Sequence, residues 1–214
     1  MRPGAPGAFK LWYNSHLPNL LRIPGYLWAQ RDLGLDEENR FTALYGVSSP
    51  EELPALIGWS GPSLDSIAAK EFAAWQGLQG VSRRLSNVYE QISGAPLRDP
   101  LLLSDRPLSL VTADVDPTHE AEWDRWYTEF HVHNLLKVAG YVLAGRFRAL
   151  DHPALALYEC ESEEALPSLR RGEQQHPEAQ AELERWQATG LPHVSNFGWG
   201  FHWLISKHFK WMDG

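Results

Sequence analysis

Cysteine is almost missing from the sequence. The only thiol is Cys160, so an intramolecular disulfide cannot form and a cysteine-based metal site cannot be built. No apolar run approaches the roughly 20 residues that a membrane-spanning helix needs. The Gly- and Pro-rich start of the chain contains no hydrophobic segment typical of an export signal. These absences predict a cytoplasmic protein with no membrane partner.

Basic residues are also sparse and scattered. The chain has 19 Lys and Arg against 27 Asp and Glu, a formal net charge of −8 at pH 7. Nucleic-acid binding needs a concentrated positive surface, so we expect no nucleic-acid partner. Apolar residues, in contrast, make up 43% of the 214 residues and include ten tryptophans, which is enough to bury a core. Large rings with polar edges suit a hydrophobic small-molecule ligand.

One segment of the chain occurs twice. Residues 9–26 and 123–141 both contain, in order, an aromatic residue, Trp-Tyr, His, Asn-Leu-Leu, a basic residue, a β-branched residue and Gly-Tyr. The second copy has one extra residue between its Tyr and its His. Further ordered matches follow, among them Ala43-Leu44-Tyr45 with Ala156-Leu157-Tyr158 and Trp75-Gln76 with Trp186-Gln187. So many ordered matches indicate a tandem duplication.

Hydrophobic periodicity predicts nearly the same elements in both halves. We expect helices over residues 12–23, 65–76, 120–138 and 177–187, with short helices over 51–57 and 162–170. We expect strands over residues 26–32, 41–47, 85–92, 108–113, 141–150, 154–161 and 197–205. Gly25 and Gly140 follow the first long helix of each half, where a left-handed cap favours glycine. The first half has no clear counterpart of strand 108–113.

The order β-α-β-β-α-β is typical of a ferredoxin-like unit, and such a unit leaves one sheet face to be covered. We therefore predict an α+β fold in which two ferredoxin-like units pack sheet to sheet as a pseudo-dimeric α/β barrel. The first unit is placed at residues 1–96, with its first strand missing or short, and the second at residues 105–214. The sequence leaves open whether this pseudo-dimer pairs again into a homodimer.

The repeated motif points to a family. As it stands at Trp126 to Tyr141, the pattern Trp-Tyr, His, Leu-Leu, Val and Gly-Tyr resembles the dimeric α/β-barrel superfamily, and within it the EthD-like proteins. The resemblance extends over nearly the whole chain, once in each half. It implies one of the activities of that superfamily, which includes cofactor-free monooxygenases, polyketide cyclases, dehydratases, muconolactone isomerase and haem-binding enzymes.

His16 and His131 are the leading catalytic candidates, because an imidazole titrates near neutral pH and can act as general acid or base. Helical spacing puts Trp12 four residues before His16 but Tyr127 four residues before His131. We therefore expect the two histidines to have different neighbours. Tyr127 and Arg146 complete the catalytic candidates, since a strand arginine that points into a pocket could hold a carboxylate or stabilise an enolate or phenolate. Equally, such an arginine could pair with an acidic neighbour at a sheet edge. The alternative is that both histidines simply fix their helix to the sheet.

The remaining candidates are binding residues. We expect the substrate-binding set to include Trp12, Tyr13, Asn19, Arg31, Trp126, Asn134, Trp199 and His202. Alternation along the last strand would send Trp199 and Phe201 to one face and His202 to the other. We expect no metal site, because His131 and His133 lie about 200° apart around a helix and cannot chelate one ion together.

Three functions are compatible with these residues. The first is a cofactor-independent enzyme that uses histidine acid/base chemistry on a hydrophobic aromatic or polyketide-like small molecule, as a lyase, dehydratase, cyclase or isomerase. The second is a haem-binding or oxygenase member of the same superfamily, with His131 or His16 as the iron ligand. The third is a non-catalytic small-molecule binding protein. No cofactor is expected for the first, and haem is the alternative.

Overall fold

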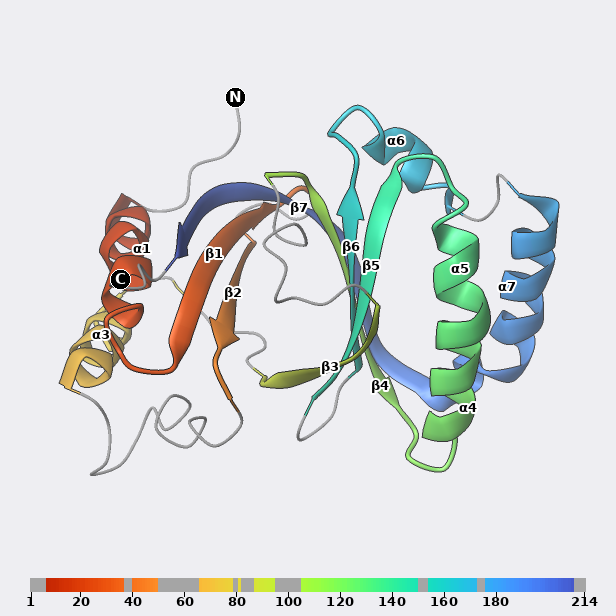
Figure 1. Ribbon diagram of the computed structural model, residues 1–214, viewed down its shortest axis with the longest axis horizontal. Helices are drawn as coiled ribbons and strands as arrows, with labels where there is room; N and C mark the ends of the chain where they lie inside the picture. Colours follow the sequence, from red (N-terminus) through yellow and green to blue (C-terminus); the bar gives the residue numbers. More distant parts are fainter. Residues whose placement is uncertain are drawn as a thin grey trace. The chain divides into compact units, whose positions relative to one another are not determined.

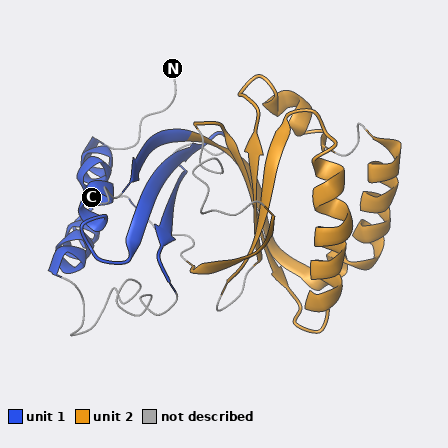
Figure 2. Cartoon of the chain, in the orientation of Figure 1, with its two compact units in different colours: residues 1–84, 204–214 blue, residues 85–203 orange. Residues whose placement is uncertain are grey.

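The computed structural model describes residues 7–36, 40–49, 66–78, 81, 87–94, 105–149, 154–172 and 176–209. The chain divides into two compact units (Figure 2). Unit 1 consists of residues 1–84 and 204–214, and unit 2 of residues 85–203. The sequence predicted a simple order of residues 1–96 followed by 105–214, whereas here the end of the chain returns to unit 1. The boundaries of the two repeats stay a prediction.

Unit 2 is an antiparallel sheet with helices on one face (Figure 1). Its strands are β3 (Tyr89–Gly94), β4 (Leu108–Val115), β5 (Tyr141–Ala149), β6 (Ala154–Cys160) and the first part of β7 (Val194–Phe209). They lie in the order β7-β4-β6-β5-β3. The helical elements are α4 (Glu120–Trp126), a π-helical turn η3 (Tyr127–His131), α5 (Val132–Leu135), α6 (Leu166–Leu169), α7 (Pro177–Thr189) and η5 (Leu191–His193).

Unit 1 repeats part of this plan. Helices α1 (Gly7–Leu20) and α3 (Ser66–Gln76) pack together beside strands β1 (Tyr26–Gly34) and β2 (Phe41–Val47). The strand order β2-β1-β7 places β1 next to β7, whose last residues belong to this unit. The last strand of the first half, β3, instead pairs with β5 in unit 2. Each half thus contributes its final strand, or the end of it, to the unit formed by the other half.

Aromatic rings and small residues form the core between helices and sheet. In unit 2 Trp123, Trp126 and Tyr127 from the helical segment pack on Ala144, Ala156 and other residues of the strands. In unit 1 the core combines Leu17, Leu20 and Leu21 with Tyr26 and Ala29. Small residues on the strands allow the large helix-borne rings to approach the sheet closely.

Two glycines end the first long helical segment of each half. Gly25 has φ 94° and Gly140 has φ 106°, backbone angles that only glycine adopts at low cost. A Cβ atom at Gly140 would also lie 2.9 Å from the Cβ of Ala165, so a side chain has no room there. The predicted left-handed glycine turns are therefore confirmed at both positions.

The predicted α+β class is confirmed, and every predicted strand is present within a few residues of its expected bounds. The predicted short helix over residues 51–57 lies outside the described residues. The last strand is longer than expected, running from Val194 to Phe209. Within the described part of the chain, no helix has both the length and the apolar character that crossing a bilayer requires.

Candidate functional site

A π-helical turn absorbs the extra residue of the second repeat. The N–H of Val132 bonds to the carbonyl of Tyr127, five residues earlier, instead of four. As a result Trp126 stacks on His131 with ring centroids 4.7 Å apart and planes 24° apart. Trp12 stacks on His16 in the same way, at 4.1 Å and 26°. The expectation that the two histidines have different aromatic neighbours was wrong, because it assumed an unbroken α-helix.

The tyrosine after each of these tryptophans also recurs. Tyr13 meets His16 edge-on with centroids 5.4 Å apart, and Tyr127 meets His131 edge-on at 4.6 Å. In unit 2 the hydroxyl of Tyr158 donates to that of Tyr127 over 2.9 Å. Burial raises the pKa of Tyr158 well above its usual range. This hydroxyl keeps its proton at neutral pH and can serve as a donor within the cluster, but not as a base.

In unit 1 the tyrosine pair is tied to the histidine. The Tyr45 hydroxyl lies 3.2 Å from Nε2 of His16, and burial raises the pKa of both Tyr45 and Tyr13. Nδ1 of His16 lies 2.9 Å from a carboxylate oxygen of Glu71. The Asn19 amide donates to the other oxygen of Glu71 over 2.6 Å. Burial lowers the pKa of His16, although Glu71 opposes this shift, so His16 is neutral at pH 7 with both ring nitrogens engaged.

The two predicted arginines both lie on the helix-covered face of their sheet. Nη2 of Arg146 forms an ion pair with Asp124 at 2.6 Å, and Nη1 donates to the hydroxyl of Thr128, also at 2.6 Å. The guanidinium carbon lies 4.7 Å from the centre of the Tyr127 ring. Arg31 lies 5.1 Å from the Tyr13 ring in unit 1. The Tyr127 ring thus contacts both the His131 ring and the Arg146 guanidinium, while the catalytic roles expected of these three residues stay a prediction.

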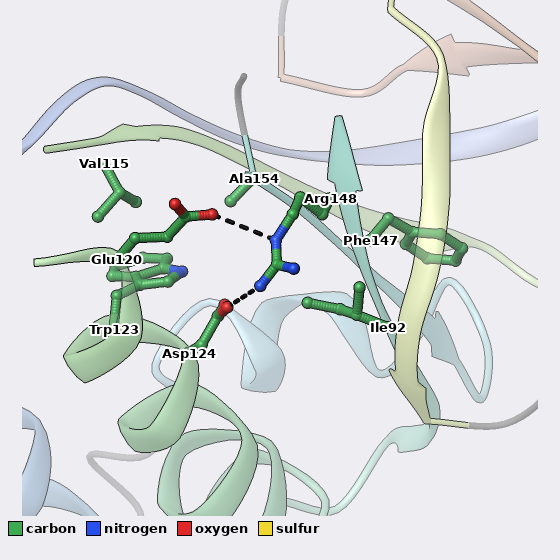
Figure 3. Close-up of a pocket in the computed structure, with 8 residues that line it drawn as sticks. All are labelled: Ile92, Val115, Glu120, Trp123, Asp124, Phe147, Arg148 and Ala154. Carbon is green, nitrogen blue, oxygen red and sulfur yellow. Dashed lines mark hydrogen bonds and ion pairs between the residues drawn. The ribbon is translucent and has the colours of Figure 1, made fainter. Parts of the chain in front are cut away.

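A small groove, partly open to solvent, lies on unit 2 (Figure 3). Its lining residues are Ile92, Val115, Glu120, Trp123, Asp124, Phe147, Arg148 and Ala154. Arg148 points between Glu120 and Asp124 and forms an ion pair with each (Figure 3). A second, smaller hollow shares Trp123 and Ala154 with the groove and is also lined by Tyr127 and Arg146.

Indole N–H groups are available around these hollows. The Nε1 atoms of Trp123 and Trp126 are buried, and neither has a hydrogen-bond partner among the described residues. A buried indole N–H usually finds an acceptor. Trp123 lines both hollows and Trp126 lines neither, so Trp123 is the indole of the two that a ligand bound there would contact.

The other predicted binding residues are placed differently. Asn134 accepts a hydrogen bond from Lys137 over 3.2 Å and is partly exposed. Trp199 is also partly exposed, and its indole donates to the Ser109 hydroxyl over 3.0 Å. The Trp199 and Phe201 rings lie 5.4 Å apart, as strand alternation predicts. His202 is buried and lies beside Leu108 in the β4–β7 ladder. Among these, none lines either hollow.

Sequence reasoning left open an acidic partner for the arginines but identified neither Glu71 nor Asp124. The carboxylate of Glu71 bonds to Nδ1 of His16, and the carboxylate of Asp124 accepts hydrogen bonds from both Arg146 and Arg148. A signal for the first was present, because Glu71 and Glu182 both stand four residues before a repeated tryptophan. Asp124 had no such signal, since its counterpart in the first repeat is Lys10.

One group of three metal-ligand side chains occurs among the described residues, formed by Asp116, His119 and His193. Their ligand atoms all lie within 4.8 Å of one another. The two imidazole rings, however, stack in nearly parallel planes with centroids 3.4 Å apart. Lone pairs in parallel planes do not converge on one ion, so the rings would have to turn before they could share a metal. The predicted absence of a metal stays a prediction.

Solved structures with the same fold exist, although no protein-family model and no curated protein matches the chain in sequence. An anthrone oxidase-like protein has a TM-score of 0.64 at 12% identity, covering 98% of this chain and 90% of its own. A proposed monooxygenase of Fusobacterium nucleatum subsp. nucleatum has a TM-score of 0.55 at 11% identity, with 95% and 87% covered. A proposed monooxygenase of Lactobacillus acidophilus has a TM-score of 0.55 at 10% identity, with 94% and 90% covered. The chain therefore has the α+β fold of these monooxygenase-like structures.

Proposed function

We propose that this chain is a cofactor-independent, oxygenase-type enzyme that acts on a hydrophobic aromatic or polyketide-like ketone or phenol in the groove of unit 2. The observation that carries the proposal is that Trp123 lines both hollows and that Arg146 and Tyr127 line the second. An apolar wall, a free indole donor and a buried cation there suit a flat ring system bearing an oxygen atom. The fold likeness to oxygenase-type proteins is consistent with this substrate class.

The proposal includes descent from a tandem duplication of an EthD-like unit. The Trp-on-His stack, the edge-on Tyr, the Arg above that Tyr and the Trp on the second long helix occur in both units at matching repeat positions. Each half also places its last strand, wholly or in part, in the unit formed by the other half. Such an exchange is what a fused pair of strand-swapping subunits would leave behind.

The proposed reaction begins with a proton transfer. His131 is half-buried at the π-helical turn and lines neither hollow, so the substrate must displace the side chains between the groove and this ring before His131 takes a proton from its acidic C–H or O–H. The resulting oxyanion is held by the Trp123 indole N–H and by Arg146. Dioxygen then accepts electrons from this anion. In the simplest case a CH₂ group becomes C=O, one oxygen atom enters the product, and the other leaves as water with the two hydrogens.

π-helical turns are rare and are concentrated at functional sites. Here the turn keeps His131 stacked on Trp126 and places it 4.6 Å from the Tyr127 ring, against 5.4 Å between Tyr13 and His16 in the first repeat. The Tyr127 ring also contacts the Arg146 guanidinium, so it lies between the proposed base and the proposed oxyanion holder.

Haem is the less favoured alternative. Both ring nitrogens of His16 already face partners, Glu71 and Tyr45, so an iron ligand role would disrupt that network. His131 packs face-on against Trp126, which covers one face of its ring. Neither histidine therefore fits the role of a proximal haem ligand. Lyase, cyclase or isomerase chemistry would use the same base and oxyanion holder without dioxygen.

The test is oxygen consumption by purified protein with an anthrone-type ketone, without added metal, flavin or hemin. We expect turnover that is lost by about a hundredfold or more in His131→Ala. His133→Ala is the matched control, because His133 is exposed and bonds only to the carbonyl of Thr128 among the contacts described here. Substrate conversion without oxygen uptake would favour the lyase or isomerase alternative. Full turnover in His131→Ala would overturn His131 as the base, and substrate binding without any conversion would leave a binding protein.

A further inference from the structure

Arg31 and Arg146 occupy the same place in the two repeats but have different surroundings. Each stands five residues after the tyrosine that opens its strand, and each is almost fully buried, with 4% and 3% of its surface exposed. Arg146 is neutralised by Asp124 and donates to Thr128 as well. Nε and Nη1 of Arg31 have no hydrogen-bond partner among the described residues. Its Nη2 reaches only Asn14 Oδ1, over a long 3.4 Å.

The reason for this difference can be read from the repeat. Asp124 stands three residues before Tyr127, and the residue three before Tyr13 is Lys10. Asn14 corresponds in the same way to Thr128 and keeps its contact with the arginine. The first repeat therefore has a cation where the second has the counter-ion of its buried arginine. Lys10 itself is exposed on α1.

No other acidic group described in unit 1 is placed to replace the missing carboxylate. Glu71 is engaged by His16 and Asn19. Asp32 follows Arg31 directly along β1 and therefore points to the opposite face of the strand. An arginine stays protonated at neutral pH. This guanidinium is therefore buried and charged, and its three N–H groups on Nε and Nη1 have no acceptor among the described residues. The Tyr13 ring, 5.1 Å away, offers a weaker cation–π contact.

The surroundings of Arg31 are otherwise aromatic. Tyr13 packs against Phe9 with centroids 4.9 Å apart and against Trp12 at 4.7 Å. Trp12 in turn lies 5.3 Å from Trp75 on α3. On the neighbouring strand β2 the residue paired with Arg31 is Ala43, whose side chain is small. A ligand that reaches the guanidinium would therefore meet rings around its body and a cation at one end.

We propose that unit 1 carries an anion-binding site at Arg31 that takes the carboxylate of a small aromatic acid. The carboxylate oxygens accept from Nε and Nη1 and take the place that Asp124 holds in unit 2. The site binds and does not turn over its ligand, because both ring nitrogens of the neighbouring His16 are already engaged. It is independent of the reaction proposed for unit 2.

The experiment uses the full chain with benzoate as probe and benzyl alcohol as its neutral analogue. Saturation is followed by quenching of tryptophan fluorescence and by the shift in Tm, since a ligand that binds the folded state raises Tm. We expect benzoate to bind at least about tenfold more tightly than benzyl alcohol. Arg31→Gln should remove this preference. His131→Ala should keep it, which separates this site from the one proposed for catalysis.

The sharper variant is Lys10→Asp, which keeps Arg31 and installs the counter-ion of the other repeat. We expect it to raise Tm and to weaken benzoate binding by about tenfold or more. Lys10→Gln removes the same cation without adding an anion and should retain binding. Lys70→Asp makes the same charge change elsewhere on the exposed surface of α3 and should also retain it. Benzoate affinity in Arg31→Gln or Lys10→Asp that equals the affinity of the unaltered chain would overturn the site, as would the absence of saturable benzoate binding to the unaltered chain.

Discussion

Trp126 and His131 are stacked although they are five positions apart, whereas Trp12 and His16 reach the same arrangement four positions apart. The difference is one residue, and the π-helical turn over Tyr127–His131 accommodates it without moving either ring of the pair. A strained helical turn that preserves a stack would not be needed for packing alone, because the first repeat packs the same rings on a regular helix.

Deleting Glu129 should convert the π turn into an α-helical turn. Glu129 is exposed, and its deletion retains both Thr128 and His131 in the sequence. Regular hydrogen bonding is the better geometry, so we expect the deletion to keep the Trp–His stack and to raise Tm by a few degrees. Arg146 should keep Thr128 and Tyr127, as Arg31 keeps Asn14 and Tyr13 on a regular helix. The His131 ring should move away from Tyr127 toward the 5.4 Å seen between Tyr13 and His16, and this displacement of the proposed base should lower turnover by about tenfold or more. Thermal unfolding and oxygen uptake measure the two effects.

Glu129→Ala is the control for this deletion, because it removes the same side chain and retains the turn. It should leave turnover close to that of the unaltered chain. A deletion variant with full activity would show that the extra residue is neutral for function.

Much of the fold could be predicted because local signals agreed with the global repeat. Gly25 and Gly140 marked the same left-handed turns, and alternating apolar residues located β2 and β6 closely. The positions of β3 and of the end of β7 could not be predicted in this way. Strand pairing between distant segments depends on tertiary packing, and one half's strand fits the other half's sheet equally well by periodicity.

The sequence singled out the aromatic and basic residues of the candidate site but not the acidic residues that bind them. Repetition drew attention to His16, His131, Arg31 and Arg146. Repetition cannot reveal Asp124, because the corresponding residue of the first repeat, Lys10, is not acidic but carries the opposite charge. The π turn was missed for a related reason: a single inserted residue in a helix changes the expected neighbours by 100° unless the backbone absorbs it.

Replacing His16 by alanine should mainly destabilise the fold. His16 is 1% exposed and connects Glu71 to Tyr45, so its removal leaves a buried carboxylate and a buried hydroxyl with one partner fewer, and a cavity. We expect the free energy of unfolding to fall by about 3 kcal/mol, as for other broken buried networks. His131→Ala should cost about 1 kcal/mol, because His131 is only half-buried. Urea denaturation of both variants compares the two costs directly.

The pH dependence of His16 provides a second check. Burial lowers its pKa in the folded state, so on acidification the unfolded chain takes up this proton first. The contribution of His16 to stability is therefore present above its ordinary value near 6.5 and is lost as the pH falls below it. His16→Gln should flatten this part of the stability curve. A curve that stays unchanged between pH 7 and pH 5 in the variant would argue against a neutral, buried His16.

Removal of metal should leave the protein unchanged. The stacked rings of His119 and His193 and the carboxylate of Asp116 stand near one another without converging on a point. Asp116 is also engaged by the hydroxyl and the N–H of Thr118, over 2.7 and 2.8 Å. We therefore expect dialysis against EDTA to shift Tm by less than about one degree and added Zn²⁺ to raise it only marginally. A clear, saturable rise that His193→Ala removes would instead identify a zinc site.

Asp32 should make the protein less stable as the pH rises. Its side chain is fully buried, and burial raises its pKa from 3.8 to about 7, although Gln30 donates to both carboxylate oxygens over 2.9 and 3.1 Å. The folded state therefore keeps a proton that the unfolded chain releases above its ordinary pKa, and stability that is complete below about pH 4 is lost progressively up to about pH 7. At about 1.4 kcal/mol per pH unit, the loss approaches roughly 4 kcal/mol.

Asp32→Asn cannot ionise, so its advantage in the free energy of unfolding should grow between pH 4 and pH 7 and then stay constant. Asp105→Asn, a substitution at an exposed position, should show no such trend. Urea denaturation at a series of pH values measures both variants, and an advantage that is the same at pH 4 and pH 8 would mean that Asp32 ionises at its ordinary pKa, through a partner such as Lys207 on β7.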